Sequence, residues 1–468
     1  MKPFFTMGLF FILSVAMTVS SCHRDTINCP MFVDVNTALE LSGENRGELQ
    51  KVLDHYHTEK PDPLKLKAAE YLISNMVAHY AVAGETMERL KRDIDTTLRD
   101  QPRALKLMFY LVAARIATER GDNTVEYDLH KITSGYLIRN IERSFEIWED
   151  IKNHYDLSRE DFFKYVLPYR INNEPLTEWK DTAYYHLYDF YKGENMGFSL
   201  SSYASYVSAK VNTYYGFGTF KSQLSDSLFK KYRMDCIDNA YSTRITNQVF
   251  GIPTAVDFVP HYPTQENRYY WTILRDHRFV NSKYYYSNTP YTAKVYRKTS
   301  FINPIPEDKN NFIPRFIRDP YKMDVTEEYE NVTSLEYEFK TCRPDTKYGY
   351  LCVFNNLAWN EVAWSEMRGG KVVFEKIGRD IVYMPCYYHG NRQVFADYPL
   401  WVRSNGEVES LVPDKERLQK LRLNRKFTYN SSGDYCGSAI IGVQIRATND
   451  LSKEPYDSIG VIRHYNYM

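Results

Sequence analysis

The chain has 468 residues, and its 59 basic side chains balance 59 acidic ones. This length predicts two to four domains, and a hydrophobic content of 43% is enough for real cores. Because the chain has neither a net positive charge nor a concentrated Lys/Arg stripe, its composition argues against nucleic-acid binding. The seven cysteines form no CxxC pair or Cys/His cluster with metal spacing, so no zinc site and no cofactor are expected.

Residues 1–21, with the sequence "MKPFFTMGLFFILSVAMTVSS", are typical of a signal peptide. Lys2 precedes an apolar run from Met7 to Val19, which is short for a membrane span. The following "VSSC" resembles a bacterial lipobox, so we expect Cys22 to be acylated and to become the mature N-terminus. This predicts a membrane-anchored lipoprotein of the cell envelope, either periplasmic or surface-exposed. Ordinary secretion with cleavage and a buried hydrophobic helix are the alternatives.

Residues 22–165 predict a helical N-terminal region. Asp62 and Pro63 suit the N-cap and first position of a helix, and Gly84 suits its end. A second helix is expected to start near Pro102. The third is indicated by apolar residues at helical spacing, namely Leu137, Ile141, Phe145 and Trp148. A fourth helix is expected to begin with the capping pattern at Ser158.

Residues 166–303 contain a cysteine placed where a helix should begin. The apolar spacing after Cys236 predicts a helix that ends before Gly251, followed by strands in "PTAVDFVP" and "YYWTILRD". Unpaired N–H groups at the start of a helix favour a thiolate, whereas the negative charges of Asp235 and Asp238 oppose it. The alternative is that Cys236 is a small buried hydrophobe, as most free cysteines are.

The last third is β-rich. Residues 304–410 alternate or run apolar between turn residues, which predicts a β-sandwich-like domain and, for the whole chain, an α+β fold. The proline-rich segment 303–320 is expected to have few backbone partners and to be open to proteases. Residues 411–468 form a short β segment that faintly resembles the end of a discoidin-like sandwich, or that completes the preceding domain. Cys342 and Cys352 are the closest candidate pair for a disulfide.

Three neighbouring stretches carry a family resemblance: "MDCIDNAYSTRITNQVFGIPTAVDFVPHY", "YYWTILRD" and "AKVYRKTSF". Together they resemble the transglutaminase-like superfamily, and within it a group of bacterial envelope lipoproteins whose preceding segment is similar to "LPYRINNEPLTEWK". The resemblance extends over roughly residues 160 to 410. It implies a cysteine-protease-like α+β core that performs acyl transfer or amide hydrolysis, with Cys at a helix start and His and Asp on the following antiparallel strands.

Only one member of the implied triad is present in its place. Cys236 matches the nucleophile, but the family histidine, two residues before the strand tryptophan Trp271, corresponds to Tyr269. The position of the family aspartate falls where the chain has no acid, and Asp276 comes too early. A phenol is a poor general base at neutral pH. We expect Tyr269 to point toward Cys236, with Asp235, Trp271 and Asp276 lining the same cleft.

Two function classes remain open. Loss of two triad positions favours a protein that has lost catalysis and serves as an envelope binding or scaffold protein for a peptide, a protein or a cell-envelope polymer. The alternative is an active cysteine acyltransferase or peptidase acting on peptide or protein amides, in which His261 or His277 replaces the missing base. The side chains that lie within reach of the Cys236 sulfur discriminate between the two classes.

Overall fold

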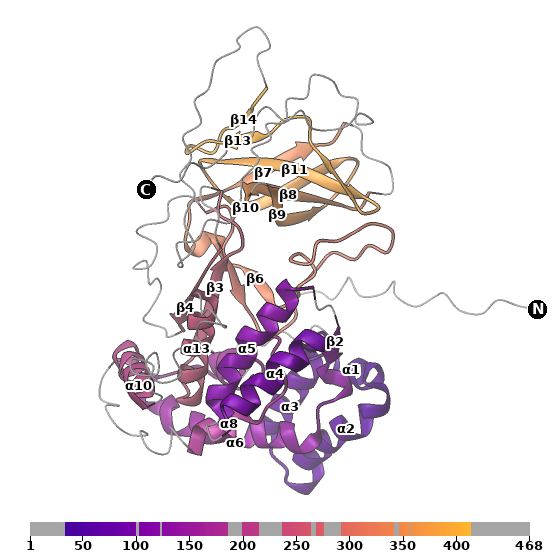
Figure 1. The fold of residues 1–468 in the computed structure, drawn as a ribbon. Coiled ribbons are helices and arrows are strands. Elements are labelled where there is room, and N and C mark those ends of the chain that lie inside the picture. The colour runs from indigo at the N-terminus through magenta and orange to yellow at the C-terminus, as the bar shows by residue number, and fades with distance from the viewer. Residues whose placement is uncertain are drawn as a thin grey trace, which may run out of the picture.

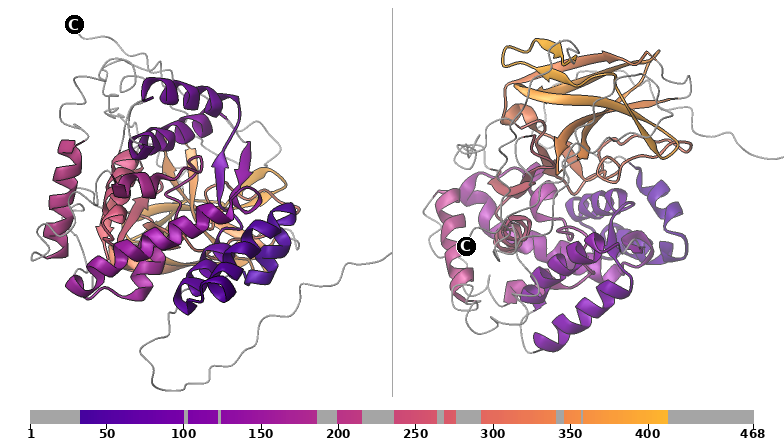
Figure 2. Two further views of the ribbon diagram at one scale, coloured as in Figure 1. Left: turned by 90° about the horizontal axis from the view of Figure 1, so that it is seen from below. Right: turned by 45° about the horizontal axis from the view of Figure 1, so that its top comes forward.

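The computed structural model of the protein describes residues 33–99, 103–121, 124–185, 199–214, 236–263, 268–275, 292–340, 346–356 and 358–412. Helices coloured indigo to magenta form the lower body in Figure 1, and strands coloured orange to yellow form a β-sandwich above it. The right-hand view in Figure 2 shows the sandwich above the helical body again, and in the left-hand view, from below, the helices lie in front of it. All the strand pairs are antiparallel, so the expected α+β class, with a helical N-terminal region and C-terminal strands, is confirmed.

The helical body is built from amphipathic and buried helices. The longer helices are α1 Val35–Leu41, α2 Arg46–Asp54, α3 Pro63–Asn75, α4 Glu85–Thr97, α5 Arg103–Glu119, α6 Ser134–Tyr155, α8 Trp179–Ala183, α10 Leu200–Tyr214 and α13 Cys236–Val249. The short helical turns are η1 Gly43–Asn45, η2 His55–Glu59, η3 Asp128–His130, α7 Arg159–Asp161, η4 Phe162–Val166 and η7 Thr326–Glu328.

Local capping chemistry fixes several helix starts where the sequence predicted them. Asp62 caps α3, because its side chain accepts the N–H groups of Leu64 and Lys65 at 3.0 Å. Ser158 caps α7 in the same way, through the N–H of Asp161 at 3.0 Å. The predicted end of the first of these helices at Gly84 is wrong. Instead α3 ends at Asn75, and Tyr80–Val82 forms strand β1.

Strand β1 exists because a partner lies beside it. β1 pairs with β2 Val125–Tyr127, a segment that follows α5 in the chain. Their cross-strand hydrogen bonds satisfy backbone groups that a continued helix would have satisfied internally, so tertiary pairing overrides the local helical pattern.

One hydrophobic core joins the helical region to the segment that follows it. Buried side chains form a continuous cluster from Ala38 in α1 to Phe301, and this cluster includes α13. The boundary expected between residues 165 and 166 therefore does not divide two separate cores. Gly251 ends α13 with φ +70°, and a Cβ there would lie 2.7 Å from Ile151, so only glycine fits this turn without a shift in the core.

A four-stranded sheet stands between the helices and the sandwich. Its order is β4-β3-β5-β6, with β3 Thr254–Val259, β4 Tyr269–Leu274, β5 Tyr296–Lys298 and β6 Lys322–Asp324. Helix α13 packs on β3 and β4. We call the side of the sheet toward α13 the helix face; it carries Val256 and Tyr270. The other side, the far face, carries Val259, Tyr269 and Trp271.

The β-sandwich consists of a large and a small sheet. The large sheet has the order β14-β13-β11-β8-β9, with β12 also paired to β11, and the small sheet pairs β10 with β7. The strands are β7 Val332–Glu338, β8 Tyr348–Asn355, β9 Ala358–Glu366, β10 Lys371–Gly378, β11 Ile381–His389, β12 Arg392–Phe395, β13 Leu400–Val402 and β14 Val408–Ser410. A second hydrophobic cluster fills the space between the two sheets and continues beneath segment 303–320.

Segment 303–320 is anchored rather than loose. The N–H of Asn303 donates to the carbonyl of Pro320 at 2.8 Å, and the N–H of Phe312 donates to the carbonyl of Gly390 at 2.7 Å. Ile313 and Ile317 are buried in the sandwich core. Backbone hydrogen bonds are few in this segment, as expected, but its buried side chains fix it to the sandwich; cleavage there by proteases stays a prediction. The expected domain boundary at residue 303 also does not coincide with the sheet boundary, since β6 belongs to the four-stranded sheet.

Several predictions fall on residues that the structure does not describe. Within the described ranges, no helix is both long and apolar enough to cross a membrane. The expected signal peptide, Cys22, and nearly all of the C-terminal segment from residue 411 lie outside the described residues, as does Cys342 of the expected disulfide.

Candidate functional site

Cys236 lies where the sequence predicted it, at the first residue of α13. Its side chain is half-buried, and its sulfur lies 3.9 Å from the carbonyl oxygen of Arg268, just before β4. The start of α13 and the start of β4 therefore meet at one edge of the sheet. This edge, with Cys236 at its centre, is the candidate site.

Tyr270, and not Tyr269, is the β4 residue that lies on the same side of the sheet as Cys236. Tyr270 packs against the same hydrophobic cluster as Cys236, and its phenol interacts electrostatically with that thiol. Tyr269 packs instead on the far face, where its ring stacks on Trp271 at 5.9 Å between centroids. Because side chains alternate along a strand, the expected orientation of Tyr269 toward Cys236 is wrong. Trp271 is likewise buried in the far-face core rather than lining a cleft beside the thiol.

Tyr270 cannot replace a histidine as a base. Burial raises the pKa of its phenol above the ordinary value, so the hydroxyl stays protonated at neutral pH. Its ring stacks on Phe258 of β3, with 4.8 Å between the centroids. The helix face is therefore aromatic beside the thiol, and it also carries the ammonium of Lys298, which lies over the Phe258 ring at 5.5 Å from its centroid.

His261 lies nearby, in the turn that leaves β3, and it interacts with the sandwich. Its side chain hydrogen-bonds with that of Asn355, at the end of β8, and the charge of Arg268 acts on it. Burial lowers the pKa of His261 to about 4, from an ordinary value of 6.5. The imidazole is therefore neutral at pH 7, and the imidazolium of a thiolate–imidazolium pair is disfavoured.

Ion pairs surround the start of α13. Arg115 of α5 donates to Asp238 at 2.8 Å, and Arg268 donates to Glu119 at 2.8 Å. Asp238 was expected to oppose a thiolate at Cys236 through its negative charge. Because Arg115 pairs with this buried carboxylate, that opposition is offset. Asp235, Asp276 and His277, which the sequence also singled out, lie outside the described residues.

The far face carries a buried charged network that the sequence analysis missed. Arg297 of β5 donates to both oxygens of Asp257 in β3, at 2.9 and 2.8 Å, and also to Glu328. The hydroxyl of Tyr329 donates to Asp257 at 2.6 Å and accepts the indole N–H of Trp271. The signal was an acid in the middle of the apolar strand "TAVDFV", since a buried carboxylate requires a cation or several donors.

The carboxylate of Asp257 is therefore already satisfied, and it lies on the opposite side of the sheet from Cys236. Burial alone would lower the pKa of Arg297, but the charge of Asp257 and the hydrogen bonds raise it above its ordinary value. The network is thus a fixed ion pair. It does not place an acid where it could orient an imidazole beside the thiol.

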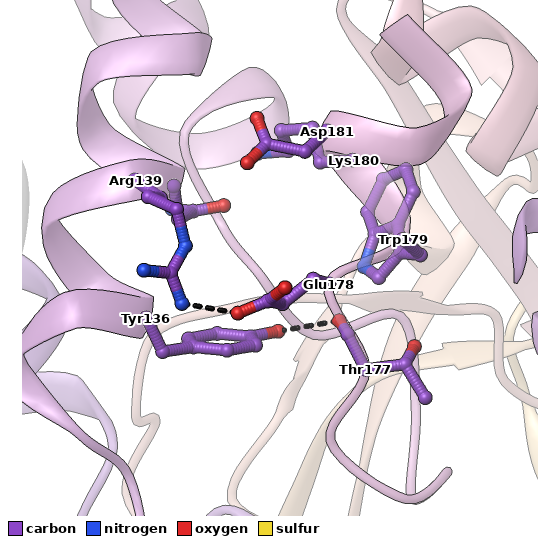
Figure 3. A pocket seen from close by; sticks show the side chains of 8 residues that line it. Tyr136, Arg139, Thr177, Glu178, Trp179, Lys180 and Asp181 are labelled. Atoms are coloured by element: carbon purple, nitrogen blue, oxygen red, sulfur yellow. Dashed lines mark hydrogen bonds and ion pairs between the residues drawn. The ribbon is translucent and has the colours of Figure 1, made fainter. Parts of the chain in front are cut away.

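A small pocket lies elsewhere, between α6 and α8 (Figure 3). Arg139 pairs with Glu178 across it, and Tyr136 donates to the carbonyl of Thr177 at 3.0 Å. The amine of Lys180 donates to Ser144 and to the carbonyls of residues 166–168, and burial lowers its pKa well below the ordinary value. These contacts dock the segment before α8 onto α6, so we assign the pocket a structural role.

One group of Cys, His, Asp and Glu side chains in the described part of the chain is compact enough to hold a metal ion. It consists of Cys352, Glu361 and Cys386 in the sandwich, away from Cys236. The spacing of these residues in the sequence gave no indication of the group, because strand pairing alone brings them together.

Comparisons with protein families, curated proteins and solved structures found no match to the chain. The transglutaminase-like resemblance therefore rests on the quoted stretches of sequence.

Proposed function

We propose that this protein is exported, held at the cell envelope by a lipid on Cys22, and acts there by binding. Its ligand class is a peptide, a protein or a cell-envelope polymer, for which the chain is a receptor or scaffold. Its transglutaminase-like core no longer performs acyl transfer. The observation that carries the loss of catalysis is that Tyr270, a phenol that burial keeps neutral, is the β4 side chain packed against the same cluster as Cys236, where a base is needed.

Two further features support the loss of catalysis. His261 is held by Asn355, and its lowered pKa disfavours the charged form that a thiolate would need beside it. Asp257 is committed to Arg297 and Tyr329 on the far face. A cysteine nucleophile needs its base within about 3 Å and that base oriented by a third group, whereas His261 and Asp257 each have their partners elsewhere.

Alkylation of Cys236 by iodoacetamide at pH 7, followed peptide by peptide by mass spectrometry, tests this proposal. We expect the rate to be no faster than that of an ordinary thiol, to rise with pH, and to be unchanged in His261→Ala. Tyr270→His should speed alkylation without producing turnover, whereas Tyr270→Phe is the matched control that keeps the ring and adds no base. Hydrolysis of peptide amides, or their transfer to an amine, should be undetectable.

The opposite result would establish the second function class. A fast-reacting Cys236 whose reactivity is lost in His261→Ala or His277→Ala, together with amide turnover, would identify a cysteine acyltransferase or peptidase with a rearranged base.

Anchoring and binding need separate tests. The wild-type chain should fractionate with membranes and carry an acyl mass on Cys22, and Cys22→Ala should move it to the soluble fraction. The purified mature chain should cosediment with isolated cell-wall polymer or with envelope proteins. Cys236→Ala should cosediment equally well, since binding does not use the thiol. A wholly soluble wild-type chain without an acyl group would refute the anchor.

A further inference from the structure

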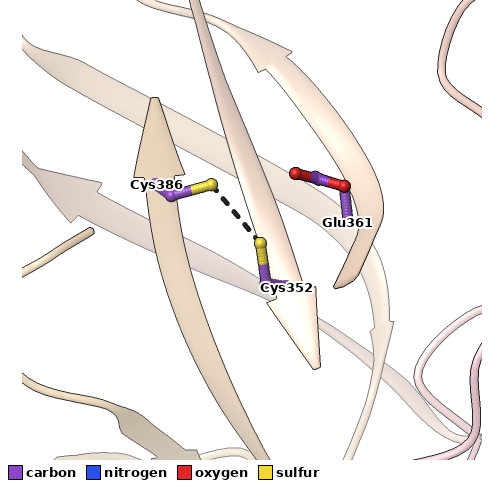
Figure 4. A group of neighbouring side chains, drawn as sticks. All are labelled: Cys352, Glu361 and Cys386. Atoms are coloured by element: carbon purple, nitrogen blue, oxygen red, sulfur yellow. Dashed lines mark hydrogen bonds between the residues drawn. The ribbon is translucent and has the colours of Figure 1, made fainter. Parts of the chain in front are cut away.

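Two buried cysteines of the sandwich lie in contact across neighbouring strands (Figure 4). Cys352 on β8 and Cys386 on β11 have their sulfur atoms 3.3 Å apart, and neither side chain is exposed. β8 and β11 are paired antiparallel, with Cys352 opposite Met384 and Cys386 opposite Tyr350. The two thiols are therefore diagonal neighbours on one face of the large sheet.

Polar side chains surround the pair. Glu361 of β9 is directly opposite Cys352, and its carboxylate accepts the hydroxyl of Tyr388. The amide N–H₂ of Gln393 on β12 lies 3.5 Å from the sulfur of Cys352, 3.4 Å from that of Cys386 and 2.8 Å from the oxygen of Glu361. Each of the three acceptor atoms thus has the same amide donor beside it.

A metal ion and a disulfide are the two chemistries that such a pair allows, and the geometry favours the disulfide. A structural zinc ion takes four ligands, with sulfur at about 2.3 Å. Here the cluster offers three, and the Gln393 amide lies beside all of them, where an ion would have to enter. The two sulfur atoms, by contrast, already touch each other. Bond formation needs a small rotation of side chains on strands that are already paired.

We propose that Cys352 and Cys386 form a disulfide bond in the exported protein. Two S–H bonds break and one S–S bond forms. The two protons and two electrons pass to the disulfide of a thiol–disulfide oxidoreductase, which is reduced to two thiols. The inference rests on the export proposed above, because such oxidants act outside the cytoplasm.

The surroundings determine when the bond forms. Burial, and the hydrogen bond with Cys386, raise the pKa of Cys352 well above its ordinary value, so the thiol of the folded chain reacts slowly. Oxidation therefore takes place while β8 and β11 are closing. Once formed, the bond is shielded from soluble reductants. It ties together two strands at the centre of the large sheet and closes the loop that contains β9 and β10.

Refolding of the purified mature chain tests the pairing directly. The protein is unfolded in denaturant with reductant and then refolded with a mixture of reduced and oxidised glutathione. Peptide mapping without reduction should recover one cross-linked species joining the peptides of Cys352 and Cys386. Cys236→Ser is the matched control, which removes a different thiol and should leave this cross-link intact.

Stability gives the second readout. Reductant added during unfolding should lower the Tm of the wild type by about 4 °C, as expected for a disulfide that closes a loop of some tens of residues in a chain of this length. Reductant should not change the Tm of the double variant Cys352→Ala/Cys386→Ala. Because each protein is compared with and without reductant, this control holds even if the Tm of the variant is low. Free thiols after refolding, a Cys342–Cys352 cross-link, or one equivalent of bound Zn²⁺ that protects both thiols would each overturn the inference.

A comparison of two locations separates this inference from the export proposal. The chain is expressed with residues 1–21 and, separately, retained in the cytoplasm without them, and both products are trapped with an alkylating reagent in the cell. A cross-link only in the first product supports both export and the disulfide. If neither product is cross-linked although refolding with glutathione forms the bond, the pairing is correct and export has failed.

Discussion

The two faces of the sheet β4-β3-β5-β6 differ in chemistry although the same strands form both of them. The helix face brings Cys236 together with aromatic rings, among them Tyr270 and Phe258. The far face carries the ion pair of Asp257 and Arg297 and the hydroxyl that completes it. A thiol and an acid are thus both present, but the sheet itself separates them.

This difference shows that residue types alone do not make a catalytic site. A buried carboxylate that is held by a bidentate arginine and a phenol contributes to the fold, and its removal leaves an unpaired buried charge. The half-buried thiol of Cys236 lies beside aromatic rings, and its replacement by a hydroxyl leaves no buried charge unpaired. The far face should therefore be sensitive to substitution in its stability, and the helix face should be tolerant.

The largest effect is expected for Arg297→Gln. This change leaves the buried carboxylate of Asp257 without its cation, so the free energy of unfolding should fall by about 3–5 kcal/mol. Chemical denaturation measures the loss. Arg403→Gln, which breaks the exposed pair with Glu409, is the matched control and should cost less than about 1 kcal/mol. Equal losses in the two variants would contradict the contrast between buried and exposed pairs.

Acid should destabilise the protein through His261, which lies where β3 leaves the sheet. Its folded-state pKa of about 4 lies below the ordinary 6.5, so the unfolded chain binds the proton more readily between these values. Stability should be unaffected above pH 6.5 and should fall as the pH drops toward 4, by up to about 3 kcal/mol. Denaturation curves at pH 7, 5.5 and 4.5 give the slope, which His261→Asn should reduce.

His79 and Asp319 also have shifted pKa values, so their contributions to the pH dependence of stability must be separated from that of His261. Burial also lowers the pKa of His79 to about 4, so some acid sensitivity should remain in His261→Asn. The pKa of Asp319 is lowered to about 2: burial opposes the shift, but the charges of Lys298 and Lys322 prevail. Its contribution is lost only below pH 3.8, outside the window. A slope that is identical in wild type and His261→Asn would show that the imidazole titrates normally.

Tyr329→Phe should have a smaller effect. The change removes the hydroxyl that donates to Asp257 and accepts from Trp271, but it keeps the ring and the arginine. Loss of a hydrogen bond to a charged group predicts about 2 kcal/mol. Tyr127→Phe, at an exposed ring, should stay within about 0.5 kcal/mol. If Tyr329→Phe left the free energy of unfolding unchanged, this would indicate that water replaces the hydroxyl.

Cys236→Ser should have the smallest effect on stability. The side chain is half-buried, and its sulfur lies 3.9 Å from the carbonyl oxygen of Arg268, which is long for a hydrogen bond. The replacement is close in size, so a loss of no more than about 1 kcal/mol is expected. A loss as large as that of Arg297→Gln would mean that the thiol is a core residue, and the contrast between the two faces would disappear.

Local signals in the sequence predicted a good part of the fold. Asp62 and Ser158 carry the chemistry of an N-cap within three residues of the groups that they satisfy, so no tertiary information was needed. The helix after Cys236 and the two strands that follow it were also predicted from short-range periodicity. In each of these cases the determinant and its structural effect lie within one turn or one strand.

Features that depend on distant pairing could not be predicted. β1 is a strand because β2 lies beside it. Cys352 and Cys386 are 34 positions apart in the sequence, and the pairing of β8 with β11 brings them into contact. The orientation of Tyr269 was predicted wrongly, because a motif spacing says which residues share a face and not which face meets the helix. Asp257 was visible in the sequence, but its partner Arg297 lies 40 positions away.

Strand β6 has a consequence for the order in which the chain can fold during synthesis. The chain leaves the four-stranded sheet at Lys298 and returns to it only at Lys322, and segment 303–320 between these strands packs on a sandwich whose strands all follow residue 331. Glu328 and Tyr329, which complete the far-face network, follow β6. A nascent chain that ends near residue 303 therefore has an unfinished sheet. Arg297 and Asp257 then lack Glu328 and Tyr329, and the edge of β5 that pairs with β6 is open. Fragments that end near residue 303 should aggregate, whereas those that end near residue 331 carry every strand of that sheet.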